Sequence, residues 1–117
     1  MLPAALVLLA ACASVDPTLT PVEQGRVLYD TYCAECHGPR AVGTREGPGL
    51  LDARSQADSM SDAEFLDATV NGVDAGETEF AGMAAIPAVD EEEAALITLY
   101  IRDLQRGSAI PSGSSLP

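Results

Sequence analysis

The stretch Cys33-Ala34-Glu35-Cys36-His37 contains two of the three cysteines of the chain and its only histidine. Positions i, i+3 and i+4 of a helix share one face, so a helical conformation directs both thiols and the imidazole to the same side. This C-x-x-C-H spacing is the attachment signal for c-type haem. Both sulfurs can then bond the two vinyl groups at one porphyrin edge, with His37 beneath the iron as its proximal ligand. The motif therefore predicts one covalently attached haem c.

Three other uses of these residues fit the sequence less well. A thioredoxin-like C-x-x-C follows a strand, and no strand pattern precedes Cys33. A structural zinc ion needs four ligands, which the chain supplies only if Cys12 joins the motif. A structural disulfide between Cys33 and Cys36 leaves His37 unexplained. Haem attachment uses all three motif residues, and we favour it.

The first 13 residues are predicted to direct export. They are almost wholly apolar, but too few to cross a bilayer, which takes about 20 residues, and they resemble the apolar region of a secretory signal. Leu9-Ala10-Ala11-Cys12 has the form of a bacterial lipobox, in which the Cys12 thiol takes a lipid; Ala11-Cys12-Ala13 also fits ordinary cleavage. We favour the lipobox, because ordinary cleavage gives Cys12 no purpose. Both patterns predict a periplasmic or extracytoplasmic protein, and the lipobox predicts a lipid anchor to the membrane.

The rest of the chain is predicted to hold one folded domain, because 117 residues allow no more. Residues 14–19 form a short tether and residues 20–106 form the domain. Residues 107–117 are rich in Gly, Ser and Pro and are predicted to be a disordered tail.

Three helix starts divide the predicted domain. They are the capping boxes Thr20-Pro21-Val22-Glu23 and Ser61-Asp62-Ala63-Glu64 and the acidic turn Asp90-Glu91-Glu92-Glu93. The first helix is expected to reach about Cys36, and the second to stop at Gly72. The third has an apolar stripe at helical spacing, formed by Leu96, Ile97, Tyr100, Ile101 and Leu104. Residues 38–60 and 72–89 show no strand alternation, so the predicted class is all-α, with about three main helices and two long loops around the haem.

The charge of the chain bears on its partners. The formal net charge is −12, from 18 acidic and 6 basic residues, which repels the phosphates of nucleic acids and excludes that class of partner. Glu77 and Glu79 fall in the loop expected near the exposed haem side, and they are candidates for contact with a basic redox partner. Arg102 and Arg106 lie near the end of the third helix, where the helix dipole favours cations.

The pattern resembles that of small bacterial class I cytochromes c between Val22 and Leu104. Gly25 and Tyr29 resemble the glycine and aromatic residue of that family's first helix, where the last helix crosses closely. The segment Gly47-Pro48-Gly49-Leu50 resembles the loop that follows the haem motif.

The resemblance assigns roles to two residues of that loop. It implies that the carbonyl of Pro48 accepts a hydrogen bond from His37, which sets the basicity of the imidazole. It also implies that Leu50 packs on the haem ring. Without the resemblance, Pro48 is an ordinary turn proline.

The candidates for the sixth iron ligand are narrowed by elimination. The chain has no second histidine and no lysine, which leaves Met60 and Met83 as soft ligands. Met60 precedes the capping Ser61 and suits a hydrophobic staple at the helix entry. The resemblance favours Met83, which lies in the loop before the last helix, although the family's proline follows the methionine directly and here comes only at Pro87. Met60 or an open site is the alternative.

The resemblance implies a single-electron carrier, not an enzyme. A His/Met iron favours the ferrous state and leaves substrates no ready access to the metal. We expect a monomer that exchanges electrons with redox proteins of a respiratory or dehydrogenase-linked chain. The alternatives are a haem domain with an open iron that binds or senses a small gas, and a haem subunit fixed within a larger oxidoreductase.

Overall fold

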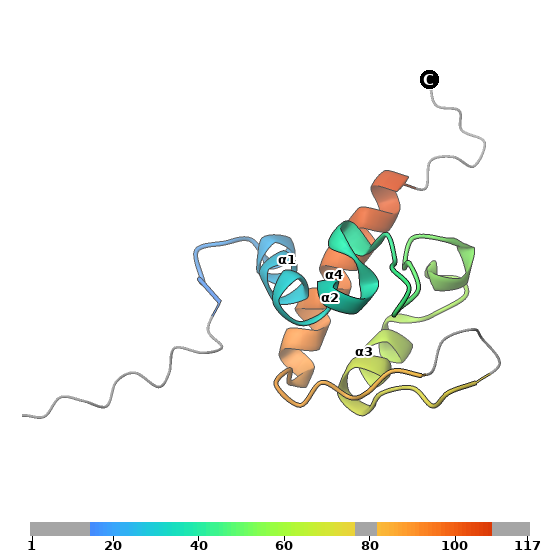
Figure 1. Ribbon diagram of the computed structural model, residues 1–117. Helices are drawn as coiled ribbons and strands as arrows, with labels where there is room; N and C mark the ends of the chain where they lie inside the picture. Colours follow the sequence, from blue (N-terminus) through green and yellow to red (C-terminus); the bar gives the residue numbers. More distant parts are fainter. Residues whose placement is uncertain (1–14, 77–81, 109–117) are drawn as a thin grey trace, which may run out of the picture.

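The computed structural model describes residues 15–76 and 82–108 and consists of helices joined by long irregular segments (Figure 1). The described elements are α1 (Pro21–Tyr32), α2 (Ala34–His37), the 3-10 turns η2 (Pro39–Ala41) and η3 (Ala53–Ser55), α3 (Asp62–Asn71) and α4 (Glu91–Ser108). Within those two ranges there is no strand, only an isolated antiparallel bridge between Val73 and Met83. The predicted all-α class with three main helices is confirmed. None of the described helices is long and apolar enough to cross a membrane.

Each main helix begins where its sequence pattern predicts. In each case one side chain accepts a hydrogen bond from the backbone N–H three residues later, and the later side chain accepts one in return. The pairs are Thr20 with Glu23, Ser61 with Glu64, and Asp90 with Glu93. At the other end of α3, Gly72 has a φ of 82° and its N–H bonds the carbonyl of Ala68. Local sequence is therefore enough to place these helix ends.

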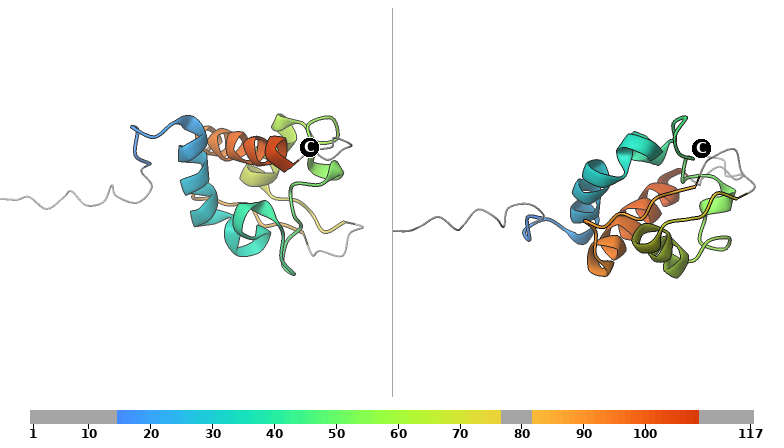
Figure 2. Two further views of the ribbon diagram at one scale, coloured as in Figure 1. Left: turned by 90° about the horizontal axis from the view of Figure 1, so that it is seen from above. Right: turned by 60° about the horizontal axis from the view of Figure 1, so that its bottom comes forward.

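Helices α1 and α4 cross at a point with no room for a side chain. Gly25 of α1 lies against the backbone of Leu96 in α4, and a Cβ added there would also come within 3.0 Å of the Cβ of Tyr100. Beside this contact, the rings of Tyr29 and Tyr100 pack with their centroids 5.4 Å apart. Figure 2 shows the two helices side by side in both views. The first and last helices therefore cross closely at Gly25 and Tyr29, as the resemblance implies.

The core lies along α4. The apolar stripe predicted for this helix is buried, except that Leu96 is half-buried. Helix α3 packs on the same helix through Phe65, which is 5% exposed. The core also contains Leu28, Tyr29, Cys33, Ala41, Val89 and Ala94.

Helix α1 is shorter than the sequence predicts. It ends at Tyr32 rather than near Cys36, and Cys33, with a φ of −119° that departs from ideal helix geometry, separates it from α2. The break turns the chain so that the hydroxyl of Tyr29 donates a 2.6 Å hydrogen bond to the carbonyl of Gly38. The expectation of one continuous helix through the motif was therefore wrong, and Cys33 lies at a corner.

Both ends of the described chain differ from the expected boundaries. In the segment expected to be a tether, Asp16 accepts hydrogen bonds from the backbone and hydroxyl of Thr18, Leu19 N–H bonds the carbonyl of Asp16, and Val15 packs on the core. These bonds form a turn within the segment expected to be a tether. At the other end, α4 continues two residues past Arg106 to Ser108, because a single glycine is only a weak helix breaker. The rest of the predicted tail lies outside the described residues.

Candidate functional site

The two thiols of the motif lie at and just after the corner between α1 and α2, since Cys33 is the corner residue and Cys36 is in α2. Cys33 is buried, Cys36 is exposed, and neither forms a disulfide. Burial raises the pKa of the Cys33 thiol to about 12, with a smaller contribution from Cys36. Both sulfurs are therefore free to form thioether bonds.

The imidazole of His37 is held by the segment that follows it. Its Nδ1 lies 2.8 Å from the carbonyl oxygen of Pro48, in the contact that the resemblance implies. Because a carbonyl can only accept, Nδ1 carries the proton and donates it, which leaves the lone pair on Nε2. A neutral imidazole in this tautomer is the form that binds a metal through Nε2.

The chain after the motif folds back onto it. The N–H of Gly43 bonds the carbonyl of His37 at 2.6 Å, and the hydroxyl of Thr44 bonds the carbonyl of Cys36. Gly47 lies so close that an added Cβ would come within 2.9 Å of the Cys36 carbonyl oxygen and 3.3 Å of His37 Nδ1. These contacts explain the glycine before Pro48, since any side chain there would displace the imidazole or its neighbour.

The turn between α2 and this segment has an unusual backbone. Arg40 and Ala41 both have positive φ, at 55° and 61°, which costs a residue with a Cβ about 1–2 kcal/mol. Ala41 is fully buried, and its carbonyl accepts a 2.9 Å hydrogen bond from the N–H of Leu50. The half-buried side chain of Leu50 packs against the core. The turn therefore brings residues 47–50 back beside the motif.

The two candidate methionines are both half-buried but are held differently. Met83 exchanges two backbone hydrogen bonds of 2.8 Å with Val73, and Ile86 N–H bonds the carbonyl of Thr69 at 3.0 Å. These bonds attach the segment of Met83 to the end of α3. Met60 packs against the core before the capping residue of α3, the position expected for a hydrophobic staple.

Three residues assigned from the sequence have no described position. Cys12, the proposed lipidation site, lies in residues 1–14, and Glu77 and Glu79 lie in residues 77–81. All three fall outside the described residues.

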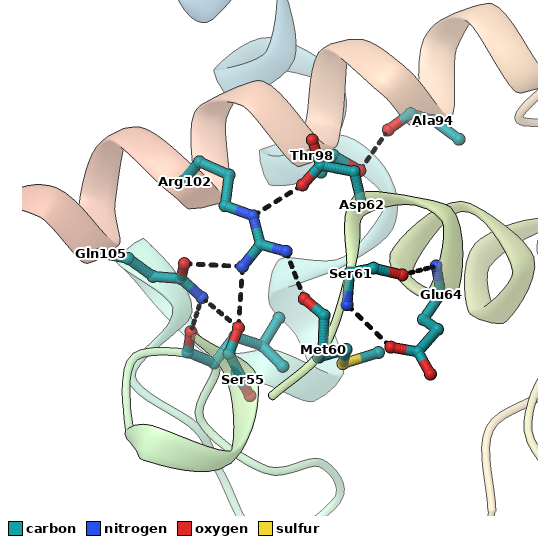
Figure 3. Close-up of polar contacts among 10 residues, drawn as sticks. Ser55, Met60, Ser61, Asp62, Glu64, Ala94, Thr98, Arg102 and Gln105 are labelled. Atoms are coloured by element: carbon teal, nitrogen blue, oxygen red, sulfur yellow. Dashed lines mark hydrogen bonds and ion pairs between the residues drawn. The ribbon is translucent and has the colours of Figure 1, made fainter. Parts of the chain in front are cut away.

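Sequence reasoning missed a polar cluster on α4 (Figure 3). Arg102 was expected only to interact with the helix dipole, but it is 8% exposed and its guanidinium bonds residues 55–62. Gln105 is 2% exposed. Thr98, Arg102 and Gln105 follow one another at intervals of four and three residues, which is a buried face at helical spacing. That spacing was the available signal, but charged and amide side chains are mostly exposed.

The donor set of the motif fits a covalently bound haem. Two free thiols are available for the thioether bonds, and the tautomer of His37 leaves Nε2 for the iron. The all-α fold and this site together define a protein of the c-type haem-binding class.

Comparison with known proteins supports this class. A sequence model of the cytochrome c family matches residues 22–105, so the chain belongs to the cytochrome c family. Members of this family carry covalent haem c and are electron-transfer proteins rather than enzymes. No curated protein matches the chain.

Among solved structures, the crystal structure of the c-type cytochrome XoxG from Methylobacterium extorquens AM1 is similar, with a TM-score of 0.61 and 24% sequence identity. The match covers 76% of this chain and 53% of XoxG. The chain thus spans about half the length of XoxG, and the likeness supports the fold.

Proposed function

We propose that this cytochrome c is a single-haem electron carrier in which Cys33 and Cys36 hold the haem, His37 is the proximal ligand and Met83 is the distal ligand. The observation that carries the proposal is the 2.8 Å contact between His37 Nδ1 and the Pro48 carbonyl. It fixes both the tautomer and the orientation that an iron ligand needs. When bound, the haem supplies an iron that accepts and releases one electron.

The residues around His37 prepare it for this role. The Pro48 carbonyl keeps the proton on Nδ1 and makes the imidazole a better donor, which favours ferric iron. Gly43 and Thr44 bond the carbonyls of His37 and Cys36, so these two motif residues are held from the same segment. A site fixed in this way needs little rearrangement when the iron changes charge.

Met83 is favoured over Met60 as the distal ligand. Met60 is held through both its backbone and its side chain. Its carbonyl accepts a hydrogen bond from Arg102, and its side chain packs against the core at the start of α3. Among the described residues, Met83 bonds Val73 through its backbone, and its side chain is not one of those packed against the core. A thioether ligand raises the potential by favouring ferrous iron.

We further propose that the protein is exported and anchored by lipid on Cys12, in a respiratory or dehydrogenase-linked chain. Bacterial c-type cytochromes are usually periplasmic, and residues 1–13 have the pattern of a lipoprotein signal. The formal charge of −12 suits a basic redox partner that meets Glu77 and Glu79. Electron transfer to such a partner slows as salt rises, because salt screens the attraction between charges.

The proposal is tested with the full chain matured by a haem-attachment system. We expect a pyridine haemochrome spectrum of haem c, with one haem per chain that stays attached in a denaturing gel. Cys36→Ala loses one thioether bond and changes that spectrum, whereas the matched variant Glu35→Ala, on the same short helix, keeps it. A wild-type chain without covalent haem refutes the proposal. Rapid CO binding by the ferrous protein would instead favour an open-iron gas-binding domain.

A further inference from the structure

Two members of the buried polar cluster on α4, Arg102 and Gln105, form hydrogen bonds with residues 50–62 (Figure 3). Buried polar groups are costly unless they are hydrogen-bonded. Among the described residues, no buried side-chain nitrogen or oxygen lacks a partner. The cluster is therefore fully satisfied, and a satisfied network of this kind fixes a single arrangement of its members.

Arg102 is the centre of the cluster. Its Nε donates to Asp62 at 2.8 Å, and its two terminal nitrogens donate to the carbonyls of Ser55 and Met60. One of these nitrogens also donates to Oε1 of Gln105 at 2.8 Å. The guanidinium carbon lies 4.7 Å from the centre of the Phe65 ring.

Arg102 determines which way the amide of Gln105 points. A guanidinium has donors only, so the oxygen of Gln105 must face Arg102 and the amide nitrogen must face the other way. That nitrogen donates to the carbonyls of Leu50 and Ser55, each at 2.8 Å. The cluster thus extends from α4 to Leu50.

Leu50 connects this cluster to the proximal histidine. Its carbonyl is held by Gln105 and its N–H by the carbonyl of Ala41, so the residue is fixed from two sides. Pro48 lies two residues earlier, and its carbonyl meets His37. The intervening Gly49 is packed so closely that a Cβ there would come within 2.9 Å of the carbonyl of Val42. The backbone between Leu50 and Pro48 therefore has little room to shift.

We propose that Gln105 is a positioning residue for His37, which acts by holding Leu50 and thereby keeping the Pro48 carbonyl on Nδ1. The inference rests on the proposed function, because it takes His37 as the iron ligand. Loss of this hold lengthens the bond between Pro48 and His37. The imidazole then becomes a weaker donor, ferrous iron is favoured, and the reduction potential rises.

The experiment compares three haem-loaded full-length proteins: wild type, Gln105→Met and Gln56→Met. Gln56 is a matched control, because its side-chain amide also donates to a carbonyl, that of Leu51, at 2.9 Å. That bond stays within the loop and does not reach α4. We expect Gln105→Met to raise the potential and to speed solvent exchange of the His37 ring N–H, followed by NMR, about tenfold, the size of one net hydrogen bond. Gln56→Met should leave both quantities unchanged.

A second variant separates positioning from packing. Gln105→Glu keeps the oxygen that faces Arg102 but cannot donate to Leu50, so it should shift the potential and the exchange rate in the same direction as Gln105→Met. The inference is overturned if Gln105→Met matches wild type, or if Gln56→Met shifts both quantities equally. Covalent haem in all these proteins supports the proposed function whatever their potentials, so the two failures are distinguishable.

Discussion

Two long irregular segments connect the helices of this protein, and different contacts hold them in place. Residues 38–50 bond the carbonyls of both Cys36 and His37 and place Pro48 on the imidazole, and Leu50 is tied to α4. Residues 72–76 and 82–89 are joined to each other by the Val73–Met83 pair, and their described backbone bonds to α3 are those of Gly72 with Ala68 and of Ile86 with Thr69. The segment of Pro48 is thus held by the motif itself, and the segment of Met83 by the end of α3.

The largest expected effect concerns the distal side. Met83→Ala removes the sulfur and should lower the reduction potential on the order of 0.2 V, within the roughly 0.8 V range that axial ligands span. The sulfur-to-iron charge-transfer band of the ferric protein should disappear. Met60→Leu is the control and should retain the band. An unchanged ferric spectrum in Met83→Ala would assign the iron to another ligand.

A matched pair of glycines tests the difference in packing between the segments. Gly47→Ala places a Cβ within 2.9 Å of the Cys36 carbonyl and should lower the free energy of unfolding by about 2 kcal/mol. Gly76→Ala in the other segment meets a single atom of the described residues, at 3.9 Å, and should change it by less than about 0.5 kcal/mol. Denaturant unfolding followed by circular dichroism measures both. Equal losses would mean that the two segments are packed alike.

Alkaline pH tests the bond between Tyr29 and Gly38, where the first segment begins. Burial raises the pKa of Tyr29 well above its usual 10, so folding favours the protonated phenol. This stabilisation is complete below pH 10 and is lost as pH rises beyond it, by about 1.4 kcal/mol at pH 11. Tyr29→Phe should lack this loss in denaturant unfolding at pH 9 to 11. Burial raises the pKa of Tyr100 too, which affects both proteins, and parallel pH profiles would contradict the assignment.

The smallest expected effect concerns the turn at residues 40–41. Arg40→Gly relieves a φ of 55° and should stabilise the protein by about 1 kcal/mol. The nearby exposed Arg45 is the matched control. It has no positive φ, so glycine there only adds freedom to the unfolded chain and should be neutral or destabilising. A thermal melt of each variant decides the sign, and a lower midpoint for Arg40→Gly would show that the turn is not strained.

The sequence predicted the structural features that depend on residues close together in the chain. The capping pairs, the stop at Gly72 and the apolar stripe of α4 all follow from spacings within one helix. The corner at Cys33 and the positive φ of Arg40 were missed, because no glycine or asparagine marks either position. The role of Arg102 was also missed, since three of its hydrogen-bond partners lie 40 or more residues earlier in the chain. No local pattern records a hydrogen bond over that distance.

The missing side chain of Gly25 has a consequence for the order of events during synthesis. Helix α1 gains its closest packing contact, at Gly25, only from the backbone of α4, which begins roughly 70 residues later in the chain. Contacts of such long range form late. A chain that emerges with its N-terminus first therefore presents residues 33–37 before the helix that completes the core beside Cys33 exists. Haem attachment can then precede folding, while both cysteines are still accessible.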